Sequence, residues 1–163
     1  MSKKSIFLKY NEVMGPCLVT GFDNEIGLNT VDWGVFRPTD ASHSSDEGLI
    51  RFGGKVHPTH FAFTKMADCT STVFYKEATV GTAAKCTVSI AESVNNATMA
   101  VRTLGLDTVL ITRYAVTIQG NVPVESMGCQ YDSLMDTVNS YSSKGKVTAS
   151  KVFGYDVVSG EKL

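Results

Sequence analysis

The chain has 163 residues, 43% of them hydrophobic, and its 15 basic and 16 acidic side chains give a formal net charge of −1. This length suits one domain with its own core, and the hydrophobic share excludes an intrinsically disordered chain. The balanced charge argues against nucleic-acid binding, and no apolar run approaches the ~20 residues that a membrane-spanning helix needs. We therefore expect a single domain over residues 1–163, with no nucleic-acid partner and no membrane insertion.

The first fifteen residues and the cysteines bear on where the protein folds. The opening MSKKSIFLKYNEVMG lacks the apolar stretch of a cleaved secretion signal. The four cysteines are widely spaced without a C-x-x-C pair, which argues against a zinc site. Cys86 and Cys129 alternate with apolar neighbours, which favours buried free thiols and a reducing compartment. We expect folding in the cytoplasm and export without a cleaved signal peptide, to the cell exterior or a target cell.

Alternation of apolar and polar residues with a period of two dominates the chain and predicts strands. A first short strand is expected at 5–10, and the segment 27–38 places Val31 and Trp33 on one face. A polar stretch rich in Ser, Asp and Gly then predicts a long exposed loop at 37–50. Further strands are expected in RFGGKVHPTHFAFTK, KCTVSI, TMAVRTLGL, TVLITRYAVTI and PVESMGCQYDSLM.

One short helix is expected over about residues 71–80. Thr70 or Ser71 can cap its start, and Gly81 can end it. A Ser/Lys/Gly-rich stretch at 139–146 predicts a flexible segment. Because a strand-rich chain has to close on itself or cover its edges, we expect a mainly β fold. Its architecture is a closed or two-sheet β-barrel of about seven to nine strands with this one helix.

The spacing H-x-x-H at His57 and His60 is the first candidate for chemistry. Residues three apart on a strand point to opposite faces, so the two imidazoles do not converge on one metal ion. Cys69 lies near the expected helix start, where the helix dipole can lower a thiol pKa, but we interpret it as a structural thiol. No protease or nucleotide-binding motif occurs. We expect no metal, no cofactor and no enzymatic activity.

Several segments together resemble the haemolysin-coregulated protein family, whose members form the inner tube of bacterial type VI secretion. The segment FLKYNEVMG resembles the family's opening strand and turn, and VDWGVFRPT its S-W-G segment. HPTHFAFTK, followed by Asp68, Ser71 and Tyr75, resembles its H-x-x-F-x-x-T-K-x-x-D-x-x-S stretch, with Gly81 at the end of the helix. FGYDVVSGEK resembles the tail of longer members. The resemblance covers roughly residues 5–135 and the tail.

The resemblance implies a structural protein that forms hexameric rings stacked head to tail into a tube. A contractile sheath expels such a tube, which meets spike and baseplate proteins and can carry small effector proteins in its lumen. In this setting the loop at 37–50 would reach a neighbouring ring. Head-to-tail stacking is heterologous, so it can propagate without end.

Individual residues can be assigned to these surfaces as hypotheses. If Trp33 lies in the core, Asp32 faces away from it, and we expect Asp32 to line the lumen. Charged and polar residues of the loop and of the helix region are candidates for ring or stacking contacts: Asp40, Ser45, Asp46, Glu47, Arg51, Lys65, Asp68 and Lys76.

Two other interpretations fit the same pattern. A tail-tube protein of a contractile phage would share the fold and serve a different machine. A monomeric ligand-binding β-barrel would instead enclose an apolar cavity, and its mass in solution would be that of one chain. An enzyme is the least favoured of these interpretations, because the sequence shows no paired catalytic groups.

Overall fold

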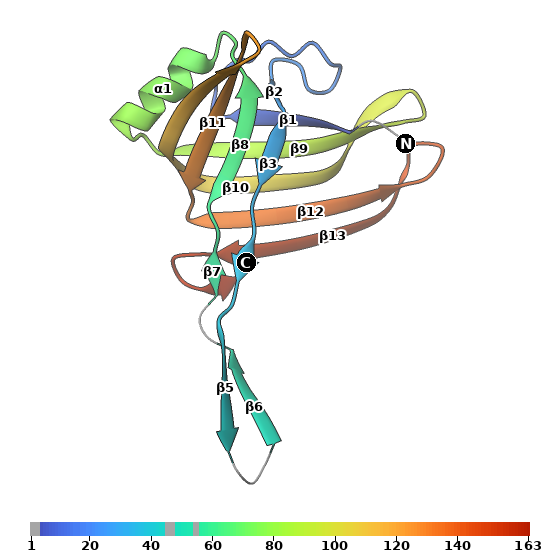
Figure 1. Ribbon diagram of the computed structural model, residues 1–163. Helices are drawn as coiled ribbons and strands as arrows, with labels where there is room; N and C mark the ends of the chain where they lie inside the picture. The colour runs from blue at the N-terminus through green and yellow to red at the C-terminus, as the bar shows by residue number, and fades with distance from the viewer. Residues whose placement is uncertain (1–3, 45–47, 54–55) are drawn as a thin grey trace.

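The computed structural model describes residues 4–44, 48–53 and 56–163, and Figure 1 shows a strand-rich body from which one hairpin projects. Its one helix in these residues is α1 (Ser71–Val80). The strands are β1 (Ser5–Tyr10), β2 (Ile26–Leu28), β3 (Thr30–Asp32), β4 (Val35–Phe36), β5 (Thr39–Ser44), β6 (Gly48–Gly53), β7 (His57–Pro58), β8 (Phe61–Met66), β9 (Ala84–Val94), β10 (Ala97–Gln119), β11 (Val122–Gln130), β12 (Ser133–Tyr141), β13 (Val147–Asp156) and β14 (Glu161–Lys162).

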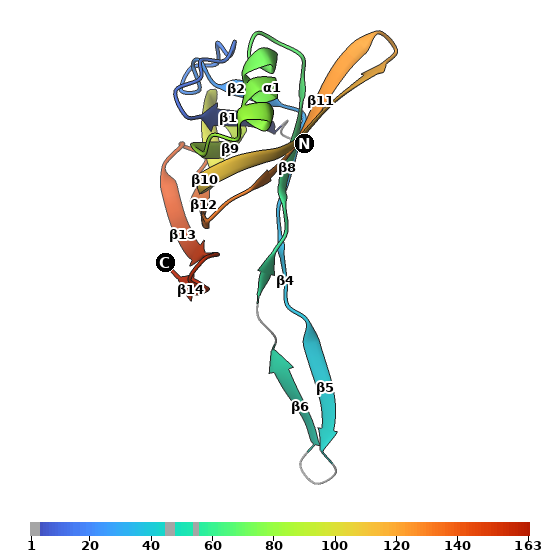
Figure 2. The same ribbon diagram turned by 90° about the vertical axis from the view of Figure 1, so that its left-hand side faces the viewer.

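Two sheets share the long strand β10. Sheet A has the order β2-β1-β9-β10-β12-β13-β14, and sheet B the order β10-β11-β8-β3. Figures 1 and 2 show the strands of sheet B running crosswise over the concave face of sheet A. The mainly β class with one helix is confirmed. The hydrogen-bonded order of the described strands does not close, so a closed barrel is not confirmed, and ten strands in the main sheet exceed the predicted seven to nine.

Irregularities in β10 let one strand serve both sheets. Its first part pairs with β9 and β12, and its second part, from Leu110, pairs with β11. Between Leu106 and Val109 the register shifts, and Thr108 adopts a positive φ of 53°. Such a bulge bends a strand and increases its twist, which redirects the chain from one sheet into the other.

The space between the two sheets is filled by apolar side chains. Phe61 and Phe63 of β8 face Leu104 and Leu106 of β10, and all four are at most 2% exposed. The helix contributes Phe74, which is fully buried and lies edge-on to Phe63, with ring centroids 5.7 Å apart. The ligand-binding barrel predicted an apolar cavity here, whereas the interior holds interlocking aromatic and aliphatic side chains.

The helix matches its predicted bounds, and Gly81 ends it as predicted. Gly81 has φ +75° and ψ +42°, and its N–H donates to the Glu77 carbonyl 2.9 Å away. Only glycine adopts this left-handed conformation without a steric cost. Of the two predicted caps, Thr70 is the N-cap residue, although its side chain makes no capping hydrogen bond.

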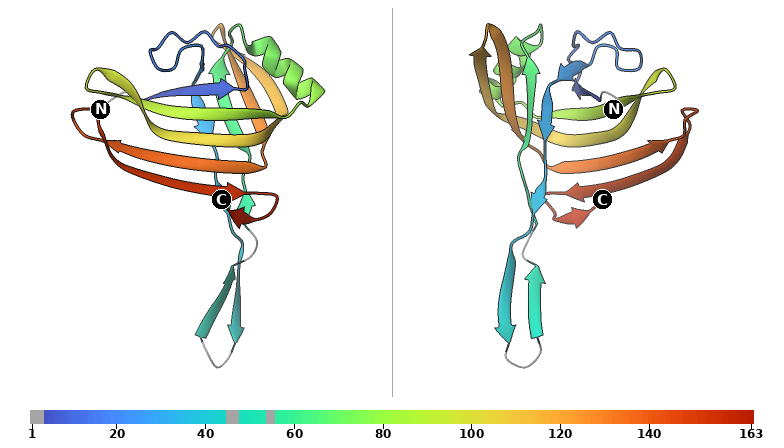
Figure 3. Two further views of the ribbon diagram at one scale, coloured as in Figure 1. Left: turned by 180° about the vertical axis from the view of Figure 1, so that it is seen from behind. Right: turned by 45° about the vertical axis from the view of Figure 1, so that its right-hand side comes forward.

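Two segments predicted as irregular are β-hairpins. Most of 37–50 lies in β5 and β6, which pair from Thr39–Gly53 to Ser44–Gly48 and extend away from the body, as Figure 3 also shows. The stretch 139–146 belongs partly to β12 and then forms a turn, where the Ser142 N–H donates to the Lys146 carbonyl at 2.8 Å. Polar composition gave no sign of the paired backbone in either segment. No helix among the described residues has the length and apolarity to cross a membrane.

Candidate assembly surfaces

Lys65, predicted to contact another subunit, instead lies inside this one. Its side chain is 0% exposed, and its Nζ lies 2.8 Å from Glu125 Oε2 and 2.9 Å from Asp68 Oδ1. It also donates to the Met66 carbonyl at 2.9 Å, and Tyr114 donates to Glu125 Oε1 at 2.6 Å. The prediction for Lys65 was therefore wrong, because a buried and fully paired ammonium cannot reach a second subunit.

The pairing shifts the acidities of this buried group. Burial alone would raise the pKa of Glu125, but hydrogen bonds from Lys65 and Tyr114 and the charge of Lys65 outweigh it and lower the pKa. For Asp68, burial is likewise outweighed by hydrogen bonds from Thr70 and Lys65, so its pKa is also lowered. Both carboxylates thus stay ionised beside the ammonium. We call this structural cluster of Lys65, Asp68, Tyr114 and Glu125 the Lys65 clamp.

Asp68 also shapes the start of the helix. Its Oδ1 accepts from the Thr70 N–H at 2.7 Å, and its own N–H donates to Ser71 Oγ at 2.9 Å. These are the local bonds of a turn before a helix, as its sequence position indicated. The side chain is 19% exposed and already bound to Lys65, so it offers little to another subunit.

Asp32 and Lys76 lie on the surface. Lys76 is exposed on α1, and Asp32 is exposed at the end of β3. Trp33 is half-buried against the core, as expected, and the Arg102 guanidinium lies 4.8 Å from its ring centroid. Asp32 borders a shallow hollow of about 460 Å³ on the outer face of sheet B, with Arg113 across it. Most of the other residues that line it are small or polar: Thr30, His60, Ala62, Thr64, Thr112, Ser126 and Gly128. Phe63 and Met127, whose side chains are buried, also border it.

Two of the remaining predicted contacts, Asp40 and Arg51, fall on the hairpin. Asp40 lies on β5 opposite Phe52, and Arg51 lies on β6 opposite Ala41. Ser45, Asp46 and Glu47 lie outside the described residues. The backbone therefore brings Asp40 and Arg51 onto neighbouring strands, and their role at a subunit contact stays a prediction.

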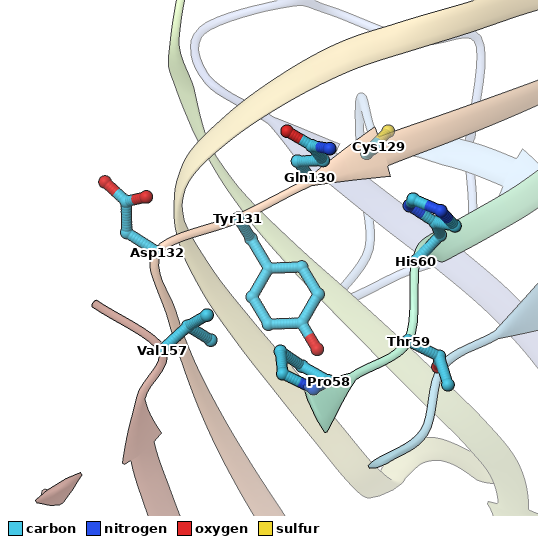
Figure 4. Close-up of a pocket in the computed structure, with 8 residues that line it drawn as sticks. All are labelled: Pro58, Thr59, His60, Cys129, Gln130, Tyr131, Asp132 and Val157. Carbon is cyan, nitrogen blue, oxygen red and sulfur yellow. The ribbon is translucent and has the colours of Figure 1, made fainter. Parts of the chain in front are cut away.

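The H-x-x-H segment borders a pocket of about 310 Å³ drawn in Figure 4. The ring of Tyr131 points toward Pro58, with Asp132 and His60 on either side. His57 is turned to another neighbour, because its ring stacks on Phe36 at a centroid distance of 5.2 Å. The two histidines of this segment therefore have different neighbours: His57 lies against Phe36, and His60 lies at the pocket.

Cys86 and Cys129 follow the sequence prediction of buried free thiols, and the interpretation of Cys69 as a structural thiol stays a prediction. Cys86 and Cys129 are buried and free, and burial raises the pKa of the Cys129 thiol to about 12. A thiol with that pKa remains protonated at neutral pH and is chemically inert. Cys69 is exposed and free.

Solved structures of type VI secretion proteins share this fold. The chain superimposes on "Structure of a type six secretion system protein" with a TM-score of 0.85 and 17% identity, covering 99% of this chain and 100% of that one. For Hcp1 from Salmonella typhimurium the TM-score is 0.78 at 16% identity, with 100% of both chains covered. For a type VI secretion system effector from Yersinia pestis it is 0.71 at 17% identity, covering 93% and 99%.

The family follows from the sequence match. Residues 7–137 match the model of a family described as Type VI secretion system effector, Hcp. The chain therefore belongs to the Hcp family, as its motifs indicated, and it is a secreted type VI protein that serves as a tube subunit. It is a structural protein and not an enzyme. A search of curated protein sequences found no match.

The geometry adds residues that the sequence reasoning missed. Glu125, Tyr114 and Arg113 were not singled out, yet the first two complete the Lys65 clamp and the third borders the hollow beside Asp32. A signal for Glu125 was present, because it shares the alternating phase of Met127 and Cys129, both of which are buried.

Proposed function

We propose that six copies of this chain join side by side into a ring, that rings stack into a tube, and that sheet B lines its channel. The observation that supports this is the open form of sheet B. Its outer strands, β3 and the second part of β10, each pair on one side only among the described strands. Unpaired edges of this kind bind further strands, and a ring of copies would cover both edges at once.

The strand directions fit this joining. The neighbours β10, β11, β8 and β3 are all antiparallel, so β3 of one copy can continue the pattern with β10 of the next. The sheet would then run unbroken around the ring. Its outer face, with Asp32, Arg113 and small polar side chains, would face water in the channel, where small effectors are carried.

The remaining partners follow from the same assembly. The convex face of sheet A would lie on the outside of the tube and meet the sheath, while spike and baseplate proteins would meet the tube ends. The hairpin β5–β6 extends away from the body, and in the proposed tube it would reach the next ring. We place folding in the cytoplasm and export through the secretion machine itself.

Two measurements test the ring. Size-exclusion chromatography with light scattering should give a mass about six times the 17.6 kDa of one chain. Backbone amides at the edges of Thr30–Asp32 and Leu110–Gln119 should exchange with deuterium more slowly in the ring than after dilution to single chains. A mass of one chain at every concentration would contradict the proposal, and so would rings whose edge amides exchange as fast as in the monomer.

A further inference from the structure

The loop between β1 and β2, residues 11–25, exposes apolar side chains on a rigid frame. Leu18 is 89% exposed and Met14 67%. The frame is hydrogen-bonded: the Gly15 N–H donates to the Asn24 carbonyl at 2.7 Å, and the Cys17 N–H to the Glu25 carbonyl at 3.1 Å. Because the backbone is already fixed, a partner that covers Leu18 would not have to order the loop.

Two features hold this loop in place. A Cβ at Gly15 would lie only 2.3 Å from the Glu25 carbonyl oxygen, so the two ends of the loop approach each other as only glycine allows. Phe22 is 7% exposed and stacks on Phe7 of β1, with ring centroids 4.5 Å apart. The exposed Leu18 is therefore a fixed protrusion of the surface.

The opposite end of the molecule carries an apolar groove at the base of the hairpin. It has a volume of about 210 Å³, below the roughly 300–1,000 Å³ typical of small-molecule sites. Val35 and Phe153 line it and are 65% and 52% exposed. The other lining residues are Arg37, Val56, Pro58, Tyr131, Leu134, Tyr155 and Val157. In Figure 1 the loop lies at the upper end of the body, and β4, β7 and the end of β13 at the lower end.

The charges of the two ends are complementary. Residues 11–25 contain the exposed Glu12 and Asp23 and the half-buried Glu25, and no lysine or arginine. Lys9 of β1 lies beside these three residues, so the surface around the loop keeps a net negative charge. The groove is bordered by Arg37, which is exposed, and none of its lining residues is acidic. One end therefore carries an acidic protrusion, and the other carries an apolar groove with a basic edge. Because the two surfaces differ, a contact between them is heterologous and can repeat from copy to copy without closing.

We propose that the loop 11–25 of one copy docks in the groove at the hairpin base of a second copy in the next ring, with Leu18 entering the groove beside Val35. This contact rests on the proposed stacking of rings and names the surfaces that carry it. It leaves the edges of sheet B free for the neighbours within a ring. Each subunit then uses different surfaces around the tube and along it.

Engineered disulfides test this contact directly. In a Cys17→Ser, Cys69→Ser background, Leu18→Cys is combined with Val35→Cys in one chain, and the rings are exposed to a mild oxidant. The control combines Leu18→Cys with Val147→Cys, because Val147 is a comparably exposed apolar residue, at 56%, away from the groove. The proposal predicts a ladder of covalent multimers on non-reducing gels for the first pair and at most dimers for the control.

A charge reversal adds a second readout. Arg37→Glu in the first pair places a negative charge against the acidic loop, and cross-linking should then fall about tenfold at low salt and recover in part at high salt. Rings that form normally but give no ladder would overturn the docking proposal and leave the ring intact. Single chains by light scattering would instead overturn the ring itself. A ladder in which Arg37→Glu changes nothing would overturn the charge pairing.

Discussion

Charge is used in opposite ways in two regions of the subunit. One is the junction between α1 and sheet B, where the Lys65 clamp lies, and the other is its two ends, the loop 11–25 and the groove at the hairpin base. At the junction, Lys65 is 0% and Glu125 2% exposed, and the two groups lie 2.8 Å apart. At one end, Arg37 lies beside the exposed Val35. At the other, the acidic residues belong to the same loop as Leu18, which is 89% exposed. A buried pair fixes the fold of one chain, whereas exposed charge beside exposed apolar surface remains available to a second chain.

The largest effect is expected from breaking the junction. Lys65→Ala leaves two carboxylates, Glu125 and Asp68, without their shared cation, which should lower the free energy of unfolding by about 3–5 kcal/mol. Lys76→Ala, on the exposed face of α1, is the matched control and should stay within about 0.5 kcal/mol of the parent chain. Urea denaturation of each single chain measures both. Equal losses in the two variants would refute the distinction between the two lysines.

Lowering the pH tests the same contrast between buried and exposed charges. The pKa values of Glu125 and Asp68 are lowered on folding, so their contribution is present above the unfolded values of 4.5 and 3.8 and is lost as the pH falls through the folded ones. Each group changes the free energy of unfolding by at most about 1.4 kcal/mol per pH unit in that window. Glu125→Gln should flatten the pH dependence of thermal unfolding below about pH 4.5. The same slope in Glu125→Gln and in the exposed-site control Glu161→Gln would rule this out.

Shortening the hairpin β5–β6 tests the end of the subunit that carries the apolar groove. Replacing residues 40–47 by a tight turn should leave the free energy of unfolding of the body within about 1 kcal/mol of the parent, since long surface insertions contribute little to stability. Rings should persist, while tubes seen by negative-stain electron microscopy become fewer and shorter. Tubes of parental length would show that the hairpin has no part in stacking.

The smallest effect on stability is expected at Asp32. Asp32→Gln removes one exposed charge and should change the free energy of unfolding by less than about 0.5 kcal/mol. If Asp32 faces the channel, rings form as before while the amount of effector retained in a co-purification changes. A variant that fails to form rings would place Asp32 at a subunit contact.

The regular parts of the fold could be predicted because local chemistry fixes them. Gly81 marked the end of the helix, and the alternation of Phe61 and Phe63 marked β8. Lys65 continues that same phase, so the pattern already pointed its side chain inward, but its charge suggested the surface. Its partner Glu125 is 60 residues away in sequence, and no local pattern shows that the two meet.

The long strand and the assembly surfaces were harder to predict. β10 appeared in the sequence as two separate strands, because the bulge before Val109 breaks the alternation. Leu18 belongs to no motif, and within VDWGVFRPT nothing singled out Arg37. The proposed roles of both depend on their lying at opposite ends of the folded chain. Sequence patterns report the neighbours of a residue along one element, whereas a surface is made by elements that are distant in sequence.

The sharing of β10 by both sheets has a mechanical consequence. In two separate sheets, a pull between the layers is opposed only by side-chain contacts, which give way one after another. Here the same pull also acts along the backbone of β10. This one strand is hydrogen-bonded to β9 and β12 in one layer and to β11 in the other. In the proposed tube, where sheet B forms the inner wall and sheet A the outer one, such a subunit would resist shear between the two walls.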